Sequence, residues 1–253
     1  MAAVNASERA CRCRAVAGDS RMPEEVNRIV TDALADLLLT PSADADENLV
    51  REGIARSKIH LVGNVMIDSL IANLPISRSS PILKTLGLEE KNFVYVTLHR
   101  PANVDAGEKL HATVESLVKI AADVPVVFAV HPRTAQRCRD FGIPLTGYKA
   151  LRIVEPLGYH DSLRLTETSA LVLTDSGGLQ EESTYFRTPC LTLRPNTERP
   201  VTLTLGSNRL TSLERLSADV HEALGHRFGL GQVPPLWDGQ AAPRIVTRLL
   251  EAG

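Results

Sequence analysis

LVLTDSGGLQEE, residues 171–182, is the stretch that decides the fold of this chain. Its first four residues are an apolar run, which is typical of a buried parallel strand. Asp175 to Gly178 predict a sharp turn, and the residues from Leu179 onward suit a helix. Such a helix N-terminus binds anions, because its first N–H groups have no internal partner and the helix dipole is positive there. Taken alone, the stretch also fits an ordinary strand–helix turn.

Composition limits the classes of function. The chain has 253 residues, with 28 Lys+Arg against 30 Asp+Glu and a formal net charge of −2. This balance argues against general affinity for nucleic acid, which needs a basic surface. The four cysteines form no C-x-x-C pair, and no metal site is predicted from them. No apolar run approaches the length of a membrane span, so we expect no membrane association and a cytoplasmic location.

Short strands alternate with helices along the chain, which predicts an α/β fold with doubly wound parallel sheets. Residues 1–20 lack periodicity and are expected to form a disordered tail, whereas Pro23 followed by two acids predicts a helix start. Val26, Ile29, Val30 and Ala33 mark one apolar face of that helix. Residues 75–81, with Pro75 and Pro81, are the best candidate for a linker. Strands are expected at 37–39, 58–62, 92–98, 124–130, 151–154, 171–174 and 190–193, and helices at 45–52, 67–74, 108–122, 135–140 and 160–168.

Four polar clusters each follow a predicted strand. They are His99-Arg100, His131-Pro132-Arg133, Asp175–Gly178 and Thr197-Glu198-Arg199. Because ligands of open α/β sheets bind outside the carboxyl ends of the strands, we expect these clusters to meet in one crevice. Cations around a glycine-rich helix N-terminus predict a diphosphate site. The chain has neither the P-loop motif nor the G-x-G-x-x-G dinucleotide fingerprint.

The ordered set of motifs resembles the non-hydrolysing UDP-N-acetylglucosamine 2-epimerases. The resemblance covers the chain from about Gly18 to the C-terminus. It is carried by the segments 22–28 (MPEEVNR), 63–64 (GN), 97–105 (TLHRPANVD), 130–134 (VHPRT), 155–159 (EPLGY), 173–182 (LTDSGGLQEE), 197–200 (TERP) and 237–242 (WDGQAA). Each motif alone is weak, but the ordered set is specific.

The resemblance implies two Rossmann-like domains in a GT-B-like arrangement, with an N-terminal domain that is incomplete relative to the family. The expected divisions are an unmatched tail at 1–20, a partial N-terminal domain at 21–75, a nucleotide-binding domain at 76–236 and a C-terminal helix at 237–253. The implied reaction interconverts UDP-GlcNAc and UDP-ManNAc by elimination of UDP and its re-addition, without a cofactor. UDP-sugars and UDP are thus the implied ligands, and a homodimer is the implied assembly. Cell-surface polysaccharide biosynthesis is the implied setting.

Site roles carry over position by position from the resemblance. Ser176, Gly177 and Gly178 would hold the phosphates, and Glu182 the ribose hydroxyls. Arg199 and His99 would face the diphosphate-sugar, and Arg100 and His131 would lie near it or near a second, regulatory copy of it. Glu24 and His99 are the catalytic candidates, although Glu24 fits equally a helix N-terminal acid.

The chain also departs from the family pattern. It lacks most of the half-domain that precedes Pro23 in the family, so it is expected to be N-terminally truncated. Ser162 stands where the family usually has a phenylalanine against the uracil, and Ala102 replaces a usual glutamate. Two alternatives to a working epimerase therefore stay open: a UDP-sugar-binding remnant without turnover, and a GT-B glycosyltransferase.

Overall fold

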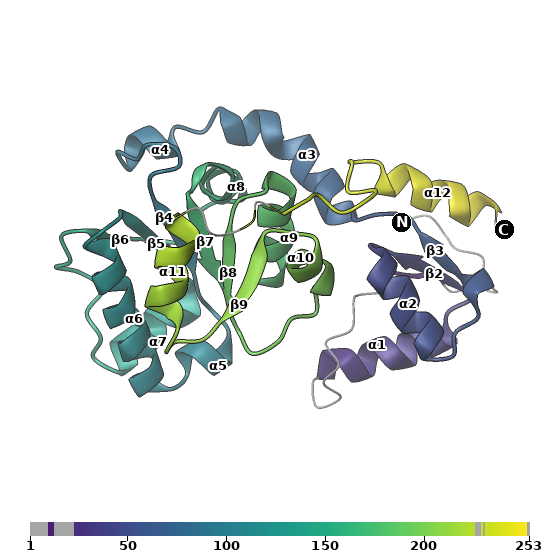
Figure 1. Ribbon diagram of the computed structural model, residues 1–253, viewed down its shortest axis with the longest axis horizontal. Helices are drawn as coiled ribbons and strands as arrows, with labels where there is room; N and C mark the ends of the chain where they lie inside the picture. The colour runs from purple at the N-terminus through teal and green to yellow at the C-terminus, as the bar shows by residue number, and fades with distance from the viewer. Residues whose placement is uncertain (1–9, 13–22, 226–228, 230, 252–253) are drawn as a thin grey trace.

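The computed structural model describes residues 10–12, 23–225, 229 and 231–251, which form two parallel β-sheets covered by helices (Figure 1). The smaller sheet has the order β1-β2-β3, with β1 at Ala10–Arg12, β2 at Leu37–Thr40 and β3 at Ile59–Leu61. The larger has the order β6-β5-β4-β7-β8-β9. Its strands are β4 (Val94–Thr97), β5 (Val126–Ala129), β6 (Leu151–Val154), β7 (Leu171–Thr174), β8 (Cys190–Leu193) and β9 (Asn208–Thr211). The predicted α/β class with parallel sheets is confirmed.

In the described part of the chain, helices lie between successive strands, and two more follow the last strand. They are α1 (Pro23–Leu34), α2 (Ala43–Arg51), α3 (Val65–Arg78), α4 (Ile82–Thr85), α5 (Pro101–Val104), α6 (Gly107–Ala121), α7 (Pro132–Asp140), α8 (Tyr159–Thr168), α9 (Gly177–Phe186), α10 (Pro200–Thr204), α11 (Leu216–Leu224) and α12 (Ala241–Glu251). A short 3-10 turn at Arg56–Lys58 precedes β3.

The larger sheet is buried on both faces, which explains its apolar strands. Val94, Val96 and Leu173 lie in a core shared with α6 and α11, whereas Tyr95 and Val127 point to the opposite face. The order of the strands reverses between β4 and β7, because chain connections run outward in both directions from this pair. Such a switch point leaves a crevice at the carboxyl ends of the strands. The polar clusters predicted after β4 and β7 therefore lie side by side.

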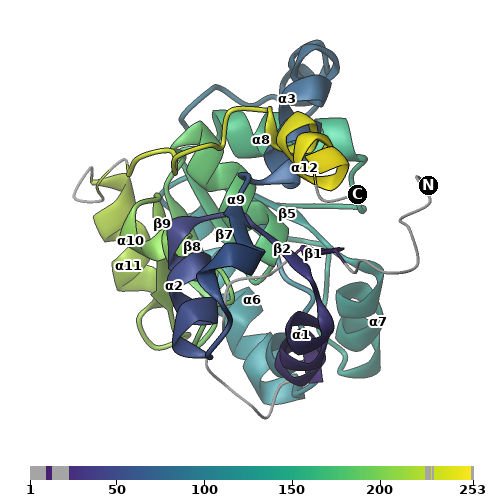
Figure 2. The same ribbon diagram turned by 90° about the vertical axis from the view of Figure 1, so that its right-hand side faces the viewer.

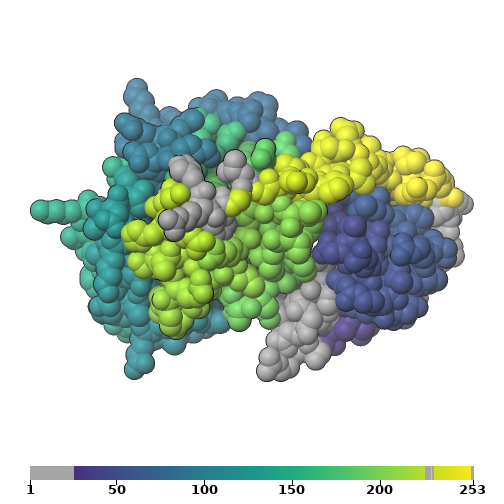
Figure 3. Space-filling model, viewed as in Figure 1, coloured from purple at the N-terminus to yellow at the C-terminus, as the bar shows by residue number. Residues whose placement is uncertain are grey.

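Two segments join the sheets. Helix α3 leaves β3 and packs along α8 of the larger unit, and the segment before α12 returns to the smaller one (Figures 1 and 2). Figure 3 shows the end of this segment and α12 as a yellow band that runs from the inner end of the larger lobe over the smaller one. The buried Trp237 donates from Nε1 to the carbonyl oxygen of Pro41 at 3.0 Å. Ile245 and Leu249 of α12 then pack against Leu37 and Leu39 of β2. The last helix therefore completes the hydrophobic core of the smaller sheet.

Three expectations for the first 80 residues need correction. Ala10–Arg12 is a strand paired in parallel with β2, so the predicted tail at 1–20 is wrong there. The rest of that segment lies outside the described residues. Helix α3 continues through Pro75 to Arg78, where a linker was expected, because Ser77 and Arg78 hold it against α8. On α1 the predicted apolar face is exposed, and the buried side chains are those of Arg28 and Asp32.

Candidate functional site

Asp175 is the buried centre of the site, at the end of β7. Its carboxylate accepts hydrogen bonds from the backbone N–H of His99 at 3.1 Å and of Arg100 at 2.9 Å. Nδ2 of Asn103 donates to the same carboxylate at 3.0 Å and to the carbonyl oxygen of Leu193 at 2.9 Å. Burial by itself would raise the pKa of Asp175, but the hydrogen bonds from His99, Asn103 and Arg100 hold it below its usual value. An ionised carboxylate therefore ties together the ends of β4, β7 and β8.

His99 takes its orientation from this carboxylate. Its Nδ1 lies 3.0 Å from Oδ1 of Asp175. Because an ionised carboxylate can only accept, Nδ1 carries the proton and Nε2 is the ring atom available to a ligand. The ring of His131 lies 5.4 Å from that of His99, between centroids. His131 caps α7 by accepting from the backbone N–H of Arg133 at 3.2 Å. The two histidines predicted to share the crevice are thus brought together.

The predicted phosphate turn is the N-terminus of α9. Ser176 is the N-cap residue, its side chain makes no capping hydrogen bond, and Gly177 and Gly178 form the first helical turn. There is a steric reason for a glycine at position 177, because a Cβ built there would lie 2.9 Å from Oε1 of Glu198. A side chain at this position would have to displace the carboxylate of Glu198, so glycine leaves Glu198 and Arg199 free to lie close to the backbone.

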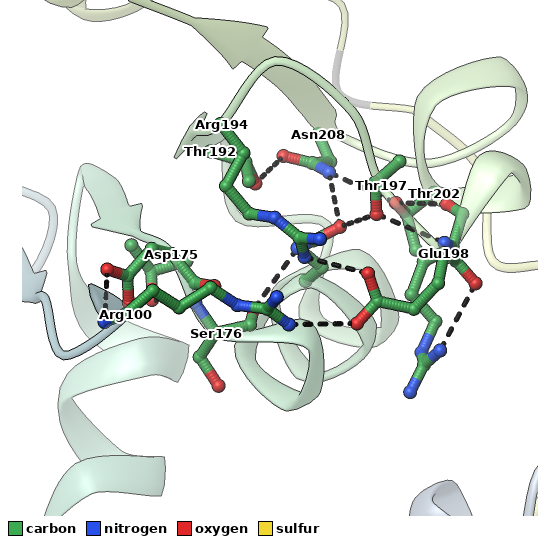
Figure 4. Close-up of polar contacts among 12 residues, drawn as sticks. Arg100, Asp175, Ser176, Thr192, Arg194, Thr197, Glu198, Thr202 and Asn208 are labelled. Carbon is green, nitrogen blue, oxygen red and sulfur yellow. Dashed lines mark hydrogen bonds and ion pairs between the residues drawn. The ribbon is translucent and has the colours of Figure 1, made fainter. Parts of the chain in front are cut away.

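A carboxylate of the chain itself lies beside this turn. Figure 4 shows Glu198 between two arginines, with Oε1 3.1 Å from Nη2 of Arg100 and Oε2 2.8 Å from Nη1 of Arg194. The contact with Arg194 is an ion pair without an aligned hydrogen bond. Burial alone would raise the pKa of Glu198. The charges of the neighbouring Arg194, Arg199 and Arg100 outweigh this effect, so its pKa lies below its usual value. The cations expected at a diphosphate site are present, and Glu198 partly neutralises them.

Arg199 lies on the other side of the same turn. It is the residue before α10, and its guanidinium is 3.7 Å from the position of a Cβ on Gly177. Its Nε is 2.9 Å from Oε1 of Glu181, again an ion pair without an aligned hydrogen bond. Nδ2 of Asn64 donates to that same oxygen at 2.9 Å. Arg199 is therefore in place beside the predicted phosphate turn.

Glu182 is buried next to Glu181 in α9. Burial first, and the charge of Glu181 second, raise its pKa to about 7. The same carboxyl helps to raise the pKa of Tyr159 to about 12, after the larger effect of burial. Ser162, the position at which loss of a stacking ring was expected, forms a 2.8 Å hydrogen bond with the buried hydroxyl of Tyr95. Its hydroxyl is therefore engaged within the protein.

Glu24 is the one predicted site residue whose position relative to this crevice is not established. It belongs to the first turn of α1, but its side chain lies outside the described residues. Its predicted catalytic role stays a prediction. Within the described ranges, no group of His, Cys, Asp and Glu side chains is arranged to hold a metal ion. None of the described helices has the length and apolar character needed to cross a bilayer.

Sequence reasoning missed three residues that build the site: Asn103, Arg194 and Asn64. Asn103 and Arg194 each follow a polar cluster or a strand end, so their positions carried a signal. Their contacts, however, carried no signal in the sequence. Asn103 donates to the carbonyl oxygen of Leu193, 90 residues away, and Arg194 pairs with Glu198 in the following loop. Asn64 was noticed within a Gly-Asn motif, but no spacing rule relates it to Glu181, 117 residues later.

Comparison with known proteins identifies the family. The family model described as UDP-N-acetylglucosamine 2-epimerase matches residues 13–250. The chain belongs to the UDP-N-acetylglucosamine 2-epimerase family. The predicted resemblance to this family is therefore confirmed.

Similar epimerases are found in archaea and bacteria. The UDP-N-acetylglucosamine 2-epimerase of Methanocaldococcus jannaschii is 38% identical over 244 residues, covering 93% of this chain and 66% of that protein. The UDP-2,3-diacetamido-2,3-dideoxy-D-glucuronate 2-epimerase of Pseudomonas aeruginosa is 39% identical and covers 77% of this chain and 54% of that protein. The chain thus spans about two thirds or less of the length of these curated relatives.

Solved epimerase structures share the fold. The M. jannaschii UDP-GlcNAc 2-epimerase, crystallised in complex with UDP-GlcNAc and UDP, superposes with a TM-score of 0.83 at 37% identity. The match covers 95% of this chain and 68% of that chain. The two parallel sheets of this chain thus have the GT-B-like α/β arrangement of the family.

Proposed function

We propose that this chain is a UDP-N-acetylglucosamine 2-epimerase, which interconverts UDP-GlcNAc and UDP-ManNAc. The observation that carries the proposal is the convergence of His99, Arg100 and Arg199 on the first turn of α9. Membership of the epimerase family gives this cationic crevice its chemistry. Backbone N–H groups and guanidinium groups suit a departing diphosphate, whose negative charge grows as its bond to the sugar breaks.

The proposed reaction has two halves. A base removes the proton from C2 of the sugar, a C1–C2 double bond forms, and UDP leaves with the electron pair of the C1–O bond. A proton is then returned to the opposite face of C2, and UDP attacks C1 again. Nε2 of His99 is available on the ligand side, because Asp175 holds Nδ1. Glu24 is the carboxylate proposed for proton exchange at C2, a role that typically contributes about 10²–10⁴-fold in rate.

The setting of this activity is also proposed. UDP-GlcNAc, UDP-ManNAc and UDP are the ligands, a homodimer is the assembly, and the cytoplasm is the location. The division at residue 236, where the chain returns to the smaller sheet, stays a proposed domain boundary, and limited proteolysis would test it. Light scattering coupled to size exclusion would show whether the chain is a dimer.

Proton NMR of the purified chain with UDP-GlcNAc in D₂O tests the reaction directly. We expect UDP-ManNAc to appear with deuterium at C2. The R199M variant should lose this turnover, whereas R248M, which alters an exposed ion pair on α12, should keep it. Broadened uridine signals without any epimer would contradict the proposed reaction and leave a UDP-sugar-binding protein.

A further inference from the structure

Asn64 follows β3 by three residues, as the N-cap of α3, and contacts the larger unit directly. It is fully buried at the N-terminus of α3, where its Oδ1 accepts from the backbone N–H of Met66 at 3.0 Å. Its amide group therefore has two separate tasks, since Oδ1 caps the helix and Nδ2 donates to Glu181 at 2.9 Å. This side-chain hydrogen bond crosses from the smaller unit to α9.

The backbone around Asn64 is fixed on both sides. Gly63 has φ +91°, and a Cβ built on it would lie 2.1 Å from the carbonyl oxygen of Leu236. Leu236 itself has φ +63°. The two segments that join the sheets thus touch backbone to backbone at this point. Nη1 of Arg244 donates to the carbonyl oxygen of Val62 at 3.2 Å. Asn64 therefore has little freedom to move relative to this junction.

Glu181 passes the contact on to the candidate phosphate site. Its carboxylate is buried, and the same oxygen, Oε1, meets both Nδ2 of Asn64 and Nε of Arg199. Asn64 and Arg199 thus hold the same buried carboxylate oxygen of Glu181 from two sides. Arg199, in turn, faces Gly177 in the first turn of α9.

We propose that Asn64 is a positioning residue for diphosphate binding: through Glu181 it holds Arg199 against the first turn of α9. The inference rests on the proposed function, because it assumes that the turn binds the diphosphate of UDP. It assigns a role to the Gly-Asn motif at the junction of the two units. Because the contacts of Asn64 and Glu181 lead to Arg199 and the phosphate turn, we expect the loss of this relay to weaken the binding of the phosphates more than that of the nucleoside.

The N64D variant isolates the relay. Aspartate is among the best N-cap residues, so it keeps a side-chain oxygen for the cap of α3. It replaces the donor to Glu181 with an acceptor. N64S also keeps a capping oxygen and removes the amide. Affinities for UDP and for uridine, measured by ligand-observed NMR or calorimetry, are compared between each variant and the wild type. We expect the Kd for UDP to rise about tenfold and the Kd for uridine to stay within about twofold.

Asn73 provides the matched control. It lies on the same helix α3, and its side chain bonds the carbonyl oxygen of Ser69 and the ring of His160, away from α9. N73D should leave both affinities unchanged. Equal loss of UDP and uridine binding in N64D and N64S would overturn the inference, since it would show a merely structural role. Unchanged UDP binding would overturn it as well.

The test separates this inference from the proposed function. A wild-type chain that binds UDP but forms no epimer would contradict the reaction alone, and the comparison of variants would still decide the relay. A wild-type chain that does not bind UDP would overturn both.

Discussion

Oε1 of Glu198 lies 3.1 Å from Nη2 of Arg100, beside the first turn of α9. An acid of the chain thus contacts the cation that is proposed to face the diphosphate. The ligand and Glu198 compete for the same positive charge. Because like charges repel in a poorly solvated site, Glu198 should weaken the binding of any dianion there.

Replacing Glu198 by glutamine is therefore expected to strengthen UDP binding. E198Q keeps the shape of the side chain and removes its charge, and we expect the Kd for UDP to fall by about threefold to tenfold at low salt. Calorimetry at two salt concentrations measures the effect, which should shrink as salt increases. The control variant E222Q removes the charge of Glu222 on α11, which pairs with Arg209 of β9, and it should leave UDP binding unchanged. Weaker binding by E198Q would show instead that the carboxylate orients the arginines productively.

Among the residues of the site, Asp175 is the one whose substitution should lower the free energy of unfolding most. D175N places an amide group against the backbone N–H groups of His99 and Arg100 and against Nδ2 of Asn103. At least one donor would then face another donor in a fully buried position. We expect the free energy of unfolding to fall by about 3 kcal/mol or more, measured with urea. D105N, which disrupts an exposed pair with Arg133, should cost far less, and a similar loss in both variants would contradict this reasoning.

The titration of Glu182 should appear in the pH dependence of stability. Its pKa is raised from 4.5 to about 7, so between these values the folded chain binds more protons than the unfolded chain. This group therefore contributes stability below pH 4.5 that is lost as the pH rises through 7, on the order of 3 kcal/mol in total. Urea unfolding of the wild type and of E182Q from pH 5 to pH 8 measures the difference. We expect E182Q to gain stability relative to the wild type over this range, and a constant difference would refute the assignment.

Trp237 should control the stability of the smaller sheet. Its ring is buried beside Ile67 and Leu70 of α3, and its Nε1 binds the carbonyl oxygen of Pro41. W237A is expected to lower the free energy of unfolding by about 3–5 kcal/mol. Hydrogen exchange should accelerate in β2 and β3 more than in β4 and β7, because the latter pair has its own core. Uniform acceleration in both sheets would contradict this.

The larger sheet was predictable from the sequence, and the reason is its burial. Strands such as β7 and β8 are covered on both faces, so they appear as apolar runs that end in polar clusters. The convergence of His99, His131 and Ser176 then followed from the parallel order of the strands. The contacts of Asp175 with His99, of Glu198 with Arg100 and of Glu181 with Asn64 could not be predicted, because each joins residues that are distant in sequence and obey no fixed spacing.

Local rules failed where tertiary contacts outweighed them. Pro75 normally ends a helix, since it lacks an N–H and clashes with the preceding turn. Helix α3 nevertheless continues, because the hydroxyl of Ser77 donates to the carbonyl oxygen of His160 and Arg78 pairs with Glu167. Strand β9 was missed because its sequence, NRLT, holds a single apolar residue, Leu210, and therefore lacks the apolar run of the central strands; it lies at the edge of the sheet.

The packing of α12 against β2 has a consequence for synthesis on the ribosome. Leu37 and Leu39 are made early, but the helix that covers them contains Ile245 and Leu249, which are made more than 200 residues later. The larger sheet holds its own core, and its strands are complete by Thr211. Of the two sheets, the one that is translated earlier is therefore completed later, and its apolar residues lack the cover of α12 until then, a stage at which exposed strands favour aggregation.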